Sequence, residues 1–591
     1  MQEIRAGYLK ISASEYHGRG KEYFLESCIG IHWKGSTMCP FFKFFLSIKF
    51  SSIVLFVWVF LAMECVAEGA EMPTVSDAET QTADSEPVKI VLDPVPLSPF
   101  NAGVFEGWGT SLCWFANRLG YDPQLTRETG RLFFNAETGL GINIVRFNIG
   151  GGDDPSHDHI RRSDSNMPGY AADYSWDAAS GKYEWSGRFD WTADADQRAV
   201  LFEAKSQAGG EFIAEAFSNS PPFFMTRSGC SSGAGNSWEN NLKDGAEADF
   251  ARYLAGVVRH YADGYCEPDG KRFPPLRFQS ISPFNEPFTN YWKAGSPKQE
   301  GCHFDLGEAQ SRMILAMDQA MKETGLEDVL LAVTEETSID TQIDALAKLS
   351  PQALDVSDRI NVHSYGGDRR EELREAVCKA GKHFWMSEVD GSGTLGGPEA
   401  GEMRPGLWLA RKIILEIGGL RPSAWVLWQL IDSHIDSAQT RFQESGNWTL
   451  RAAERGNGFW GLTVADHDKK TIRLTQKYYA FGQFTRYVRP GAFIIYAQDD
   501  VLAAWDPVRE RISIVAVNAK AEPQTCSFSF HSFGKNFTAS CANAVRTSGG
   551  SLSGEGEHWT SLSPIPIRDG ELTVALKPYS VTTFLVPFSP K

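Results

Sequence analysis

Two glutamates in similar settings are the residues of this 591-residue chain best placed to do chemistry. Glu286 lies in "ISPFNEPF" between Pro283 and Pro287, and proline ends regular structure because it lacks a backbone N–H. Glu388 follows the apolar run "HFWM" and precedes the glycine-containing "VDGSG". Each acid is therefore expected where an apolar strand gives way to a loop. Two carboxylates that face one another can act as a proton donor and a nucleophile.

The structural alternative is that each glutamate forms a salt bridge or caps a helix. The shared setting of Glu286 and Glu388 argues against it. Along the chain, Glu286 and Glu388 are separated by three strand–helix units of about 34 residues each. A typical eight-unit barrel has roughly 31 residues per unit. The spacing therefore favours two carboxylates at one end of the same sheet.

Eight short apolar runs alternate with helix-like segments such as 194–210 and 308–325. The runs are 107–112, 142–148, 211–217, 277–283, 329–335, 359–365, 383–388 and 424–430. This alternation favours an α/β fold, a (β/α)8 TIM barrel. A doubly wound sheet is the alternative, but no glycine-rich dinucleotide turn follows the first run.

Reactive side chains of such a barrel lie at the C-terminal ends of its strands. The ends of the predicted strands supply Arg146, Asn285, Glu286, His363, Tyr365, Glu388 and Trp428. Trp108 and Trp114, near the first strand, are further candidates, although most tryptophans in a barrel serve packing. Paired carboxylates at one mouth suit the hydrolysis of a glycosidic bond.

These residues carry a family resemblance. "SPFNEP" and "WMSEVDG" resemble the two signature segments of clan A retaining glycoside hydrolases. "GWGTSLCWFAN" (107–117), "NSPPFFMTRSG" (219–229), "KYYAFGQFTRYVRPG" (477–491) and "KPYSVTTF" (577–584) resemble glycoside hydrolase family 30, most closely its endo-β-1,6-galactanases. The resemblance extends from about residue 88 to the C terminus.

The resemblance implies a role for each carboxylate. Glu286 would be the general acid/base, and Glu388 the nucleophile that forms a covalent glycosyl-enzyme. The two carboxyl groups should lie ~5–5.5 Å apart. Arg146 would lower the pKa of Glu388 by proximity, and Tyr365 or His363 would hold the nucleophile.

The remaining candidates would contact the sugar. Asn285 would hydrogen-bond the 2-OH, a contact that strengthens in the transition state. Trp428 would form the floor of the site, and Trp108 and Trp114 would line subsites. The histidines of "HDH" (157–159) lack an evident third ligand nearby and are interpreted as part of a solvated loop, so no metal or cofactor is expected.

The predicted function is hydrolysis of β-1,6-galactan, as on arabinogalactan side chains, by a secreted retaining endo-glycosidase. Another family 30 specificity remains open: β-1,6-glucanase, xylanase, glucosylceramidase or β-fucosidase. So does a non-catalytic carbohydrate-binding relative. The net charge of −17 argues against a nucleic-acid partner. We expect a monomer whose partner is a polysaccharide.

The N-terminal region differs from the rest of the chain. Residues 1–67 are expected to be an extension and a signal peptide, with the true start at Met38 as one possibility. The apolar run 50–63 is shorter than the ~20 residues of a membrane-spanning helix. The alternative is an uncleaved signal anchor that leaves the enzyme outside the membrane. Residues 68–87 are acidic and polar and are predicted to be a disordered linker.

The predicted domains follow from a change of pattern near residue 485. A strand in 88–102 joins a β-sandwich, 103–484 form the catalytic barrel, and 485–591 form the C-terminal β-sandwich. Seven cysteines follow residue 67, and Cys526 and Cys541 flank a predicted hairpin and are candidates for a disulfide. Sequons at Asn447 and Asn536 fit a glycoprotein.

Overall fold

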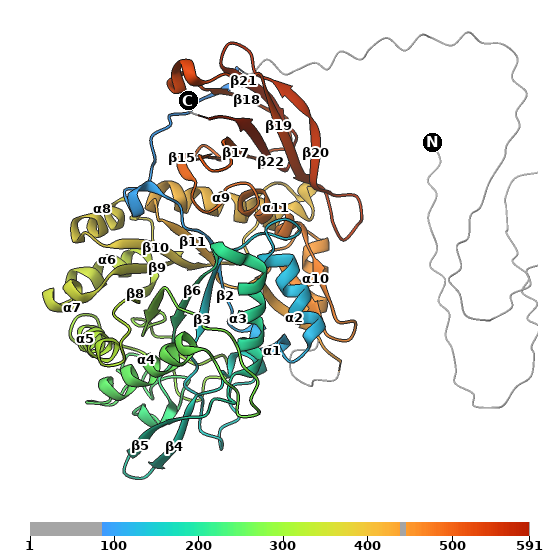
Figure 1. Ribbon diagram of the computed structural model, residues 1–591. Coiled ribbons are helices and arrows are strands. Elements are labelled where there is room, and N and C mark those ends of the chain that lie inside the picture. The colour runs from blue at the N-terminus through green and yellow to red at the C-terminus, as the bar shows by residue number, and fades with distance from the viewer. Residues whose placement is uncertain (1–85, 438–444, 590–591) are drawn as a thin grey trace, which may run out of the picture. The chain divides into compact units, whose positions relative to one another are not determined.

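The computed structural model describes residues 86–437 and 445–589 (Figure 1). The predicted signal peptide and nearly all of the predicted linker lie outside the described residues. Within the described part of the chain, no helix combines the length and the apolar character that crossing a membrane would require.

Eight parallel strands close into a barrel, which confirms the predicted (β/α)8 fold. In order around the barrel, they are β2 (Gly107–Ser111), β3 (Ile144–Asn148), β6 (Ile213–Phe217), β7 (Ser280–Ser282), β8 (Leu330–Ser338), β9 (Arg359–Gly366), β10 (His383–Val389) and β11 (Ala424–Leu427). Each strand falls on one of the eight apolar runs. The strands are apolar along most of their length because helices cover the outer face and side chains fill the interior.

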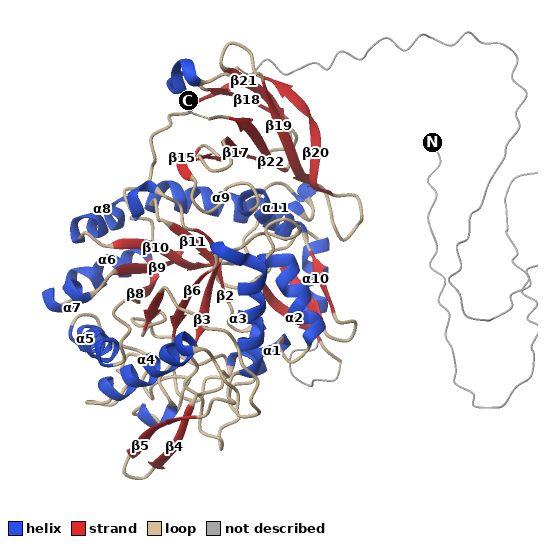
Figure 2. Cartoon of the chain, in the orientation of Figure 1, coloured by secondary structure: helices blue, strands red, loops and turns tan. Residues whose placement is uncertain are grey.

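Helices surround the barrel strands (Figure 2). The longer ones are α3 (Ala195–Ala208), α4 (Glu247–Asp263), α5 (Glu308–Glu323), α6 (Ile339–Lys348), α8 (Arg370–Ala380) and α9 (Met403–Leu420). The others are α1 (Phe115–Leu119), α2 (Pro123–Thr129), α7 (Pro351–Val356), α10 (Ser445–Glu454) and α11 (Gln476–Thr485). In α4, buried Phe250, Leu254 and Val258 recur every four residues, so this helix turns one apolar stripe toward the core.

Two additions interrupt the strand–helix alternation. A hairpin of β4 (Ala171–Asp177) and β5 (Lys182–Phe189) lies in the connection between β3 and α3. A small sheet follows β11 and contains β12 (Ile431–Ile435), β13 (Thr463–Asp466) and β14 (Thr471–Leu474). Neither was predicted, because both are insertions in the barrel's connecting loops.

A second, all-β unit has two sheets and its own hydrophobic core. The six-stranded sheet contains β15 (Phe493–Gln498), β16 (Val501–Asp506), β17 (Arg511–Asn518), β22 (Ser580–Pro587), β19 (Cys541–Ser548) and β20 (Glu557–Pro566). The three-stranded sheet contains β1 (Val88–Val91), β18 (Gln524–Ser529) and β21 (Glu571–Leu576). Strand β1 pairs in parallel with β18, so the chain contributes to this unit both before and after the barrel.

The suggested disulfide between Cys526 and Cys541 is wrong. Cys526 is buried in β18 and Cys541 is exposed at the start of β19, and both thiols are free. The two strands do not form a hairpin, because β18 belongs to the three-stranded sheet and β19 to the six-stranded one. All seven cysteines in the described residues are free.

Candidate active site

A buried network of charges occupies the C-terminal end of the barrel. Arg146 of β3 lies at its centre and is fully buried. Its Nε donates to Glu215 Oε1 at 2.9 Å, and its Nη1 donates to Glu388 Oε2 at 2.9 Å. Its Nη2 lies 3.1 Å from Glu335 Oε1. One guanidinium therefore faces three carboxylates from β6, β8 and β10, an arrangement that its planar fork of donors suits.

Glu335 is satisfied on both of its oxygens. Asn361 Nδ2 donates to Oε1 at 2.7 Å, and Ser387 Oγ donates to Oε2 at 2.7 Å. Burial raises the pKa of Glu335, but Arg146 and His363 more than offset that effect and lower the pKa to about 2. Glu335 is thus a permanent anion that helps to orient the basic groups around it.

Glu286, His363 and Glu388 converge on one point. One ligand atom from each lies within 4.8 Å of the others. Nδ1 of His363 is 3.4 Å from an oxygen of Glu286 and 3.4 Å from an oxygen of Glu388, and Nε2 is 3.2 Å from Glu335 Oε2. Burial lowers the pKa of His363, but the surrounding carboxylates, Glu388 first, raise it to about 10. The imidazole is therefore a cation between the two glutamates.

Both oxygens of Glu388 have a donor. Tyr365 O–H donates to Oε1 at 2.9 Å, and Arg146 donates to Oε2. Burial raises the pKa of Glu388, and so does the charge of Glu286, while His363, Arg146 and the Tyr365 hydrogen bond oppose the rise. Arg146 therefore acts to lower the pKa of Glu388, as expected, but burial outweighs its effect.

Glu286 is held by its backbone rather than by ion pairs with arginine. Its φ of 47° lies in the left-handed region, which is uncommon for a residue with a Cβ. Its N–H donates to the carbonyl of Glu335 at 2.9 Å, and the Trp292 indole N–H donates to its carbonyl at 2.9 Å. These contacts fix an unfavourable conformation, a pattern that clusters at functional sites.

Several buried polar atoms near the pair have no partner within the described protein. Oδ1 of Asn285 and Nε1 of Trp114 are among them. Trp114 and Trp428 meet edge to face with ring centroids 4.9 Å apart, in a cluster that includes Phe217. Arg146 stacks over the Phe217 ring at 4.1 Å, so the cluster adjoins the charged network. Unpartnered donors and acceptors beside aromatic rings suit a substrate rich in hydroxyl groups.

Trp108 does not belong to this site, which corrects its prediction as a subsite residue. It lies in the first half of β2 and is fully buried. Its indole N–H donates to the carbonyl of Val488 at 2.7 Å, and its ring packs edge to face against Trp425 and Phe481. A substrate at the opposite, C-terminal end of the strands cannot reach it.

Sequence reasoning missed several residues of the site. Glu215, Glu335, Arg359 and Asn361 complete the buried network, and Arg359 donates to Glu215. Trp460 is 37% exposed, and its ring lies 5.9 Å from that of Tyr365. A charged residue inside an apolar strand, as in "FIAEAF", is the signal that was available. No comparable signal marked Trp460, which follows the inserted helix α10.

The segment 477–491 supports the strand that carries Glu388. Lys477 of α11 is completely buried, and its Nζ donates to Asp390 Oδ1 at 2.7 Å and to the carbonyl of Phe459 at 2.9 Å. Asp390 Oδ2 accepts from the N–H of Gly461 at 2.6 Å. The ion pair therefore anchors the loop that begins two residues after Glu388 and also fixes the approach to Trp460.

Comparison with known proteins agrees with this site. The family described as "O-Glycosyl hydrolase family 30" matches residues 102–347. An endo-β-1,6-galactanase of Hypocrea rufa is 30% identical over 508 residues, which cover 84% of this chain and 94% of that protein. An exo-β-1,6-galactobiohydrolase of Bifidobacterium longum is 26% identical over 477 residues, which cover 65% of this chain and 30% of that protein.

Solved structures share the fold at lower identity. A conserved exported protein from Bacteroides fragilis has a TM-score of 0.63 and 19% identity, over 84% of this chain and 99% of that one. The catalytic domain of the family 30 xylanase C from Talaromyces cellulolyticus has a TM-score of 0.57 and 18% identity, over 84% and 99%. The family model matches this chain, and the chain covers almost the whole length of a relative that is 30% identical to it. The barrel and the carboxylate pair agree with both findings, and the chain belongs to glycoside hydrolase family 30.

Proposed function

We propose that this O-glycoside hydrolase cleaves β-1,6-galactan internally and with retention of configuration. The observation that carries the mechanism is the approach of Glu286 and Glu388, whose oxygens lie within 4.8 Å. Retaining enzymes keep their carboxyl groups about 5–5.5 Å apart, whereas inverting enzymes need about 6.5–9.5 Å to admit a water molecule. The short separation favours direct attack by one carboxylate.

The neighbours of each glutamate support the assignment of roles. Glu388 accepts from Arg146 and Tyr365, and both donors oppose the rise in its pKa that burial causes. Glu286 has no arginine partner in the described residues, and its ion-pair contact there is with the shared His363. Because two adjacent carboxylates resist double ionisation, the pair holds one proton over an intermediate pH range. We assign the acid role to Glu286, which lacks the arginine and tyrosine partners of Glu388.

The charges of the whole network agree with one retained proton. Four buried carboxylates, Glu215, Glu286, Glu335 and Glu388, face the three cations Arg146, Arg359 and His363. Protonation of one carboxylate therefore brings the network close to neutrality.

The reaction then proceeds in two displacements. Glu286 gives its proton to the glycosidic oxygen while a Glu388 oxygen bonds to the anomeric carbon, and the leaving sugar departs as an alcohol. Glu286, now a carboxylate, removes a proton from water, whose oxygen displaces Glu388. In this proposal Asn285, whose Oδ1 is unpartnered, binds the 2-OH, and Trp428, which packs edge to face against Trp114, forms the apolar floor.

The choice of β-1,6-galactan is supported by the names of the two relatives above, an endo-galactanase and an exo-galactobiohydrolase. Loops around the barrel mouth set specificity, so the fold does not decide it. Secretion is a further part of the proposal and is supported by the apolar run at 50–63. Sequencing the N terminus of the secreted product should reveal loss of residues 1–67, and a product that retains them contradicts cleavage.

The test compares the wild type with Glu388→Gln on de-arabinosylated arabinogalactan, β-1,6-glucan and glucuronoxylan. We expect a ladder of β-1,6-galacto-oligosaccharides from the first substrate only, with the β-anomer formed first in a proton NMR time course. Glu388→Gln should lower the rate by roughly 10³-fold or more.

Each other outcome contradicts one part of the proposal. Equal release by wild type and variant contradicts the nucleophile. Initial formation of the α-anomer contradicts retention, and galactobiose as the sole early product contradicts internal cleavage. Binding to galactan without any release by the wild type would indicate a carbohydrate-binding protein.

A further inference from the structure

Four side chains with metal-binding atoms meet outside the catalytic pair. Asp153, His157 and His159 belong to the loop after β3, and Cys230 belongs to the loop after β6. One ligand atom from each lies within 4.8 Å of the others. The sequence favoured a solvated loop at "HDH" because no third ligand was evident nearby, and the structure brings Asp153 and Cys230 to it.

The separations match those of ligands around one small cation. His157 Nδ1 is 3.3 Å from Asp153 Oδ1, and His159 Nε2 is 3.6 Å from Asp153 Oδ2. His159 Nε2 is 3.4 Å from Cys230 Sγ. Tetrahedral zinc, with bonds of about 2.0–2.3 Å, places neighbouring ligand atoms about 3.3–3.8 Å apart.

Hydrogen bonding alone accounts poorly for this convergence. Nε2 of His159 faces Asp153, Cys230 and also Ser232 Oγ at 3.0 Å, yet a neutral imidazole nitrogen carries at most one proton. Cys230 is buried, and the Asp153 side chain is only 6% exposed. The His157 side chain is 34% exposed, so the point where these atoms meet is partly buried. Several lone pairs directed at one such point are better satisfied by a cation than by one another.

We propose that Asp153, His157, His159 and Cys230 bind a zinc ion that joins the loops after β3 and β6. A thiolate and two imidazoles select zinc over magnesium or calcium, which prefer oxygen ligands. Four protein ligands leave no open position for a substrate, so the site is structural and not catalytic. Asp153 Oδ1 also accepts from the N–H of Ser231 at 2.9 Å, which orients the carboxylate as outer contacts of a metal site do.

The position of the site connects it to the acid/base. Ser232 Oγ donates to the carbonyl of Lys293 at 3.1 Å, and Ala234 N–H donates to the carbonyl of Trp292 at 3.2 Å. Trp292 in turn donates to the carbonyl of Glu286. The zinc would thus hold the loop that supports the strained backbone of Glu286.

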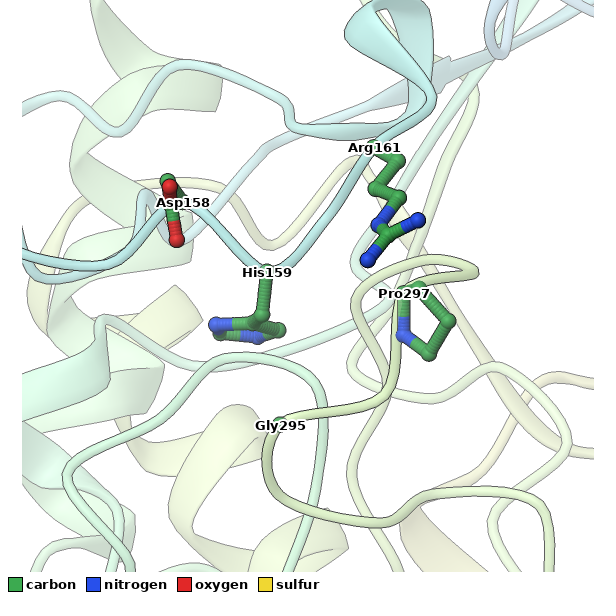
Figure 3. Close-up of a pocket in the computed structure, with 5 residues that line it drawn as sticks. All are labelled: Asp158, His159, Arg161, Gly295 and Pro297. Carbon is green, nitrogen blue, oxygen red and sulfur yellow. The ribbon is translucent and has the colours of Figure 1, made fainter.

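A surface pocket of about 490 Å³ adjoins His159 (Figure 3). Asp158, His159 and Arg161 line it from the loop after β3, and Gly295 and Pro297 line it from the loop after β7. The pocket gives solvent access to one side of the ligand set. A metal ion could therefore enter, and a chelator could remove it, without unfolding of the barrel.

The first experiment measures zinc in the purified full-length enzyme by elemental mass spectrometry after loading and gel filtration. We expect about one zinc per chain in the wild type and in Cys378→Ser, a matched control whose thiol is exposed on α8. Cys230→Ser and His159→Ala should each lose most of it. Zinc below a tenth of an equivalent in the wild type, or equal zinc in wild type and Cys230→Ser, overturns the proposal.

Cobalt substitution provides a second readout that is independent of activity and of folding yield. Cobalt in the wild-type site should give tetrahedral ligand-field bands and a thiolate charge-transfer band, and Cys230→Ser should abolish the latter. Chelation should lower the melting temperature of wild type and Cys378→Ser but leave that of Cys230→Ser unchanged. A melting temperature that does not respond to chelator in the wild type contradicts a structural zinc.

Discussion

At the scale of single residues, two chemically identical side chains are distinguished by their donors. Glu388 meets Arg146 and Tyr365, whereas Glu286 depends on its backbone and on the shared His363. Hydrogen bonds to the charged form favour ionisation, so the same group can serve as a nucleophile in one setting and as an acid in the other. Two substitutions test these roles, one at Glu286 and one at the Tyr365 donor of Glu388.

Glu286→Gln should lower kcat/KM on galactan by roughly 10²–10⁴-fold, because the leaving oxygen loses its proton donor. The loss should be much smaller for the first displacement on an aryl β-galactobioside, whose phenolate leaves without protonation. Pre-steady-state release of the phenol measures this step. A loss of the same size on both substrates would contradict the role of Glu286 as the acid.

Tyr365→Phe removes a donor that lowers the pKa of Glu388. The pKa of Glu388 should therefore rise, and the acidic limb of the kcat/KM profile should move to higher pH. A hydrogen bond to a charged group is worth about 1.5–3 kcal/mol, so the rate at the optimum should fall roughly 10- to 100-fold.

The control for this substitution is Tyr496→Phe, which removes a half-buried hydroxyl of β15 in the sandwich. It should leave the profile unchanged. An acidic limb that stays in place in Tyr365→Phe, or moves to lower pH, contradicts the contact with the nucleophile.

At the scale of elements, strand β10 depends on a helix that follows the barrel. Lys477 of α11 is fully buried with Asp390, just beyond the catalytic strand. Burial raises the pKa of Asp390, and Lys477 opposes the rise. Such a pair is costly to break, since removal of one partner leaves a buried charge without compensation.

Lys477→Met should therefore destabilise the protein by about 3–5 kcal/mol, measured by urea unfolding. The double variant Asp390→Asn/Lys477→Met, which buries no charge, should recover much of that stability. Equal losses in the single and double variants would indicate that the volume of Lys477, and not its charge, matters.

How far the sequence predicts the structure also varies between elements. The eight barrel strands could be predicted because each is a short apolar run bounded by turn residues, and Glu286 and Glu388 stand at the ends of two of them. The role of Glu335 could not be predicted, because it depends on Arg146, His363 and Ser387 from three other strands. The His157–Cys230 cluster was missed for the same reason: its ligands come from two separate loops.

At the scale of the whole molecule, one hydrophobic cluster joins the barrel to sandwich residues such as Ile494, Leu502 and Val515. Trp108, Trp425 and Phe481 pack together beside the carbonyl of Val488, where the chain leaves α11 for the sandwich. Arg411 of α9 also forms an ion pair with Asp500, in the turn between β15 and β16. The contacts indicate that Trp108 serves packing.

Trp108→Ala should lower the free energy of unfolding by about 3–5 kcal/mol, measured by urea unfolding, while the folded fraction keeps the wild-type KM. The substitution leaves a cavity in a fully buried cluster and removes no substrate contact. A KM that rises several-fold without loss of stability would restore Trp108 as a subsite residue.

The pairing of β1 with β18 has a consequence for the order in which the molecule is completed during synthesis. Val88 leaves the ribosome early, but its partner Cys526 is made only after the entire barrel. Domains generally fold as they emerge, so the barrel can close while β1 still has an unpaired edge. The three-stranded sheet therefore forms late, after β18 and β21 have been made, and β22 then completes the six-stranded sheet. Pulse-labelling of nascent chains should find protection at β1 only once its partner strand β18 has been translated.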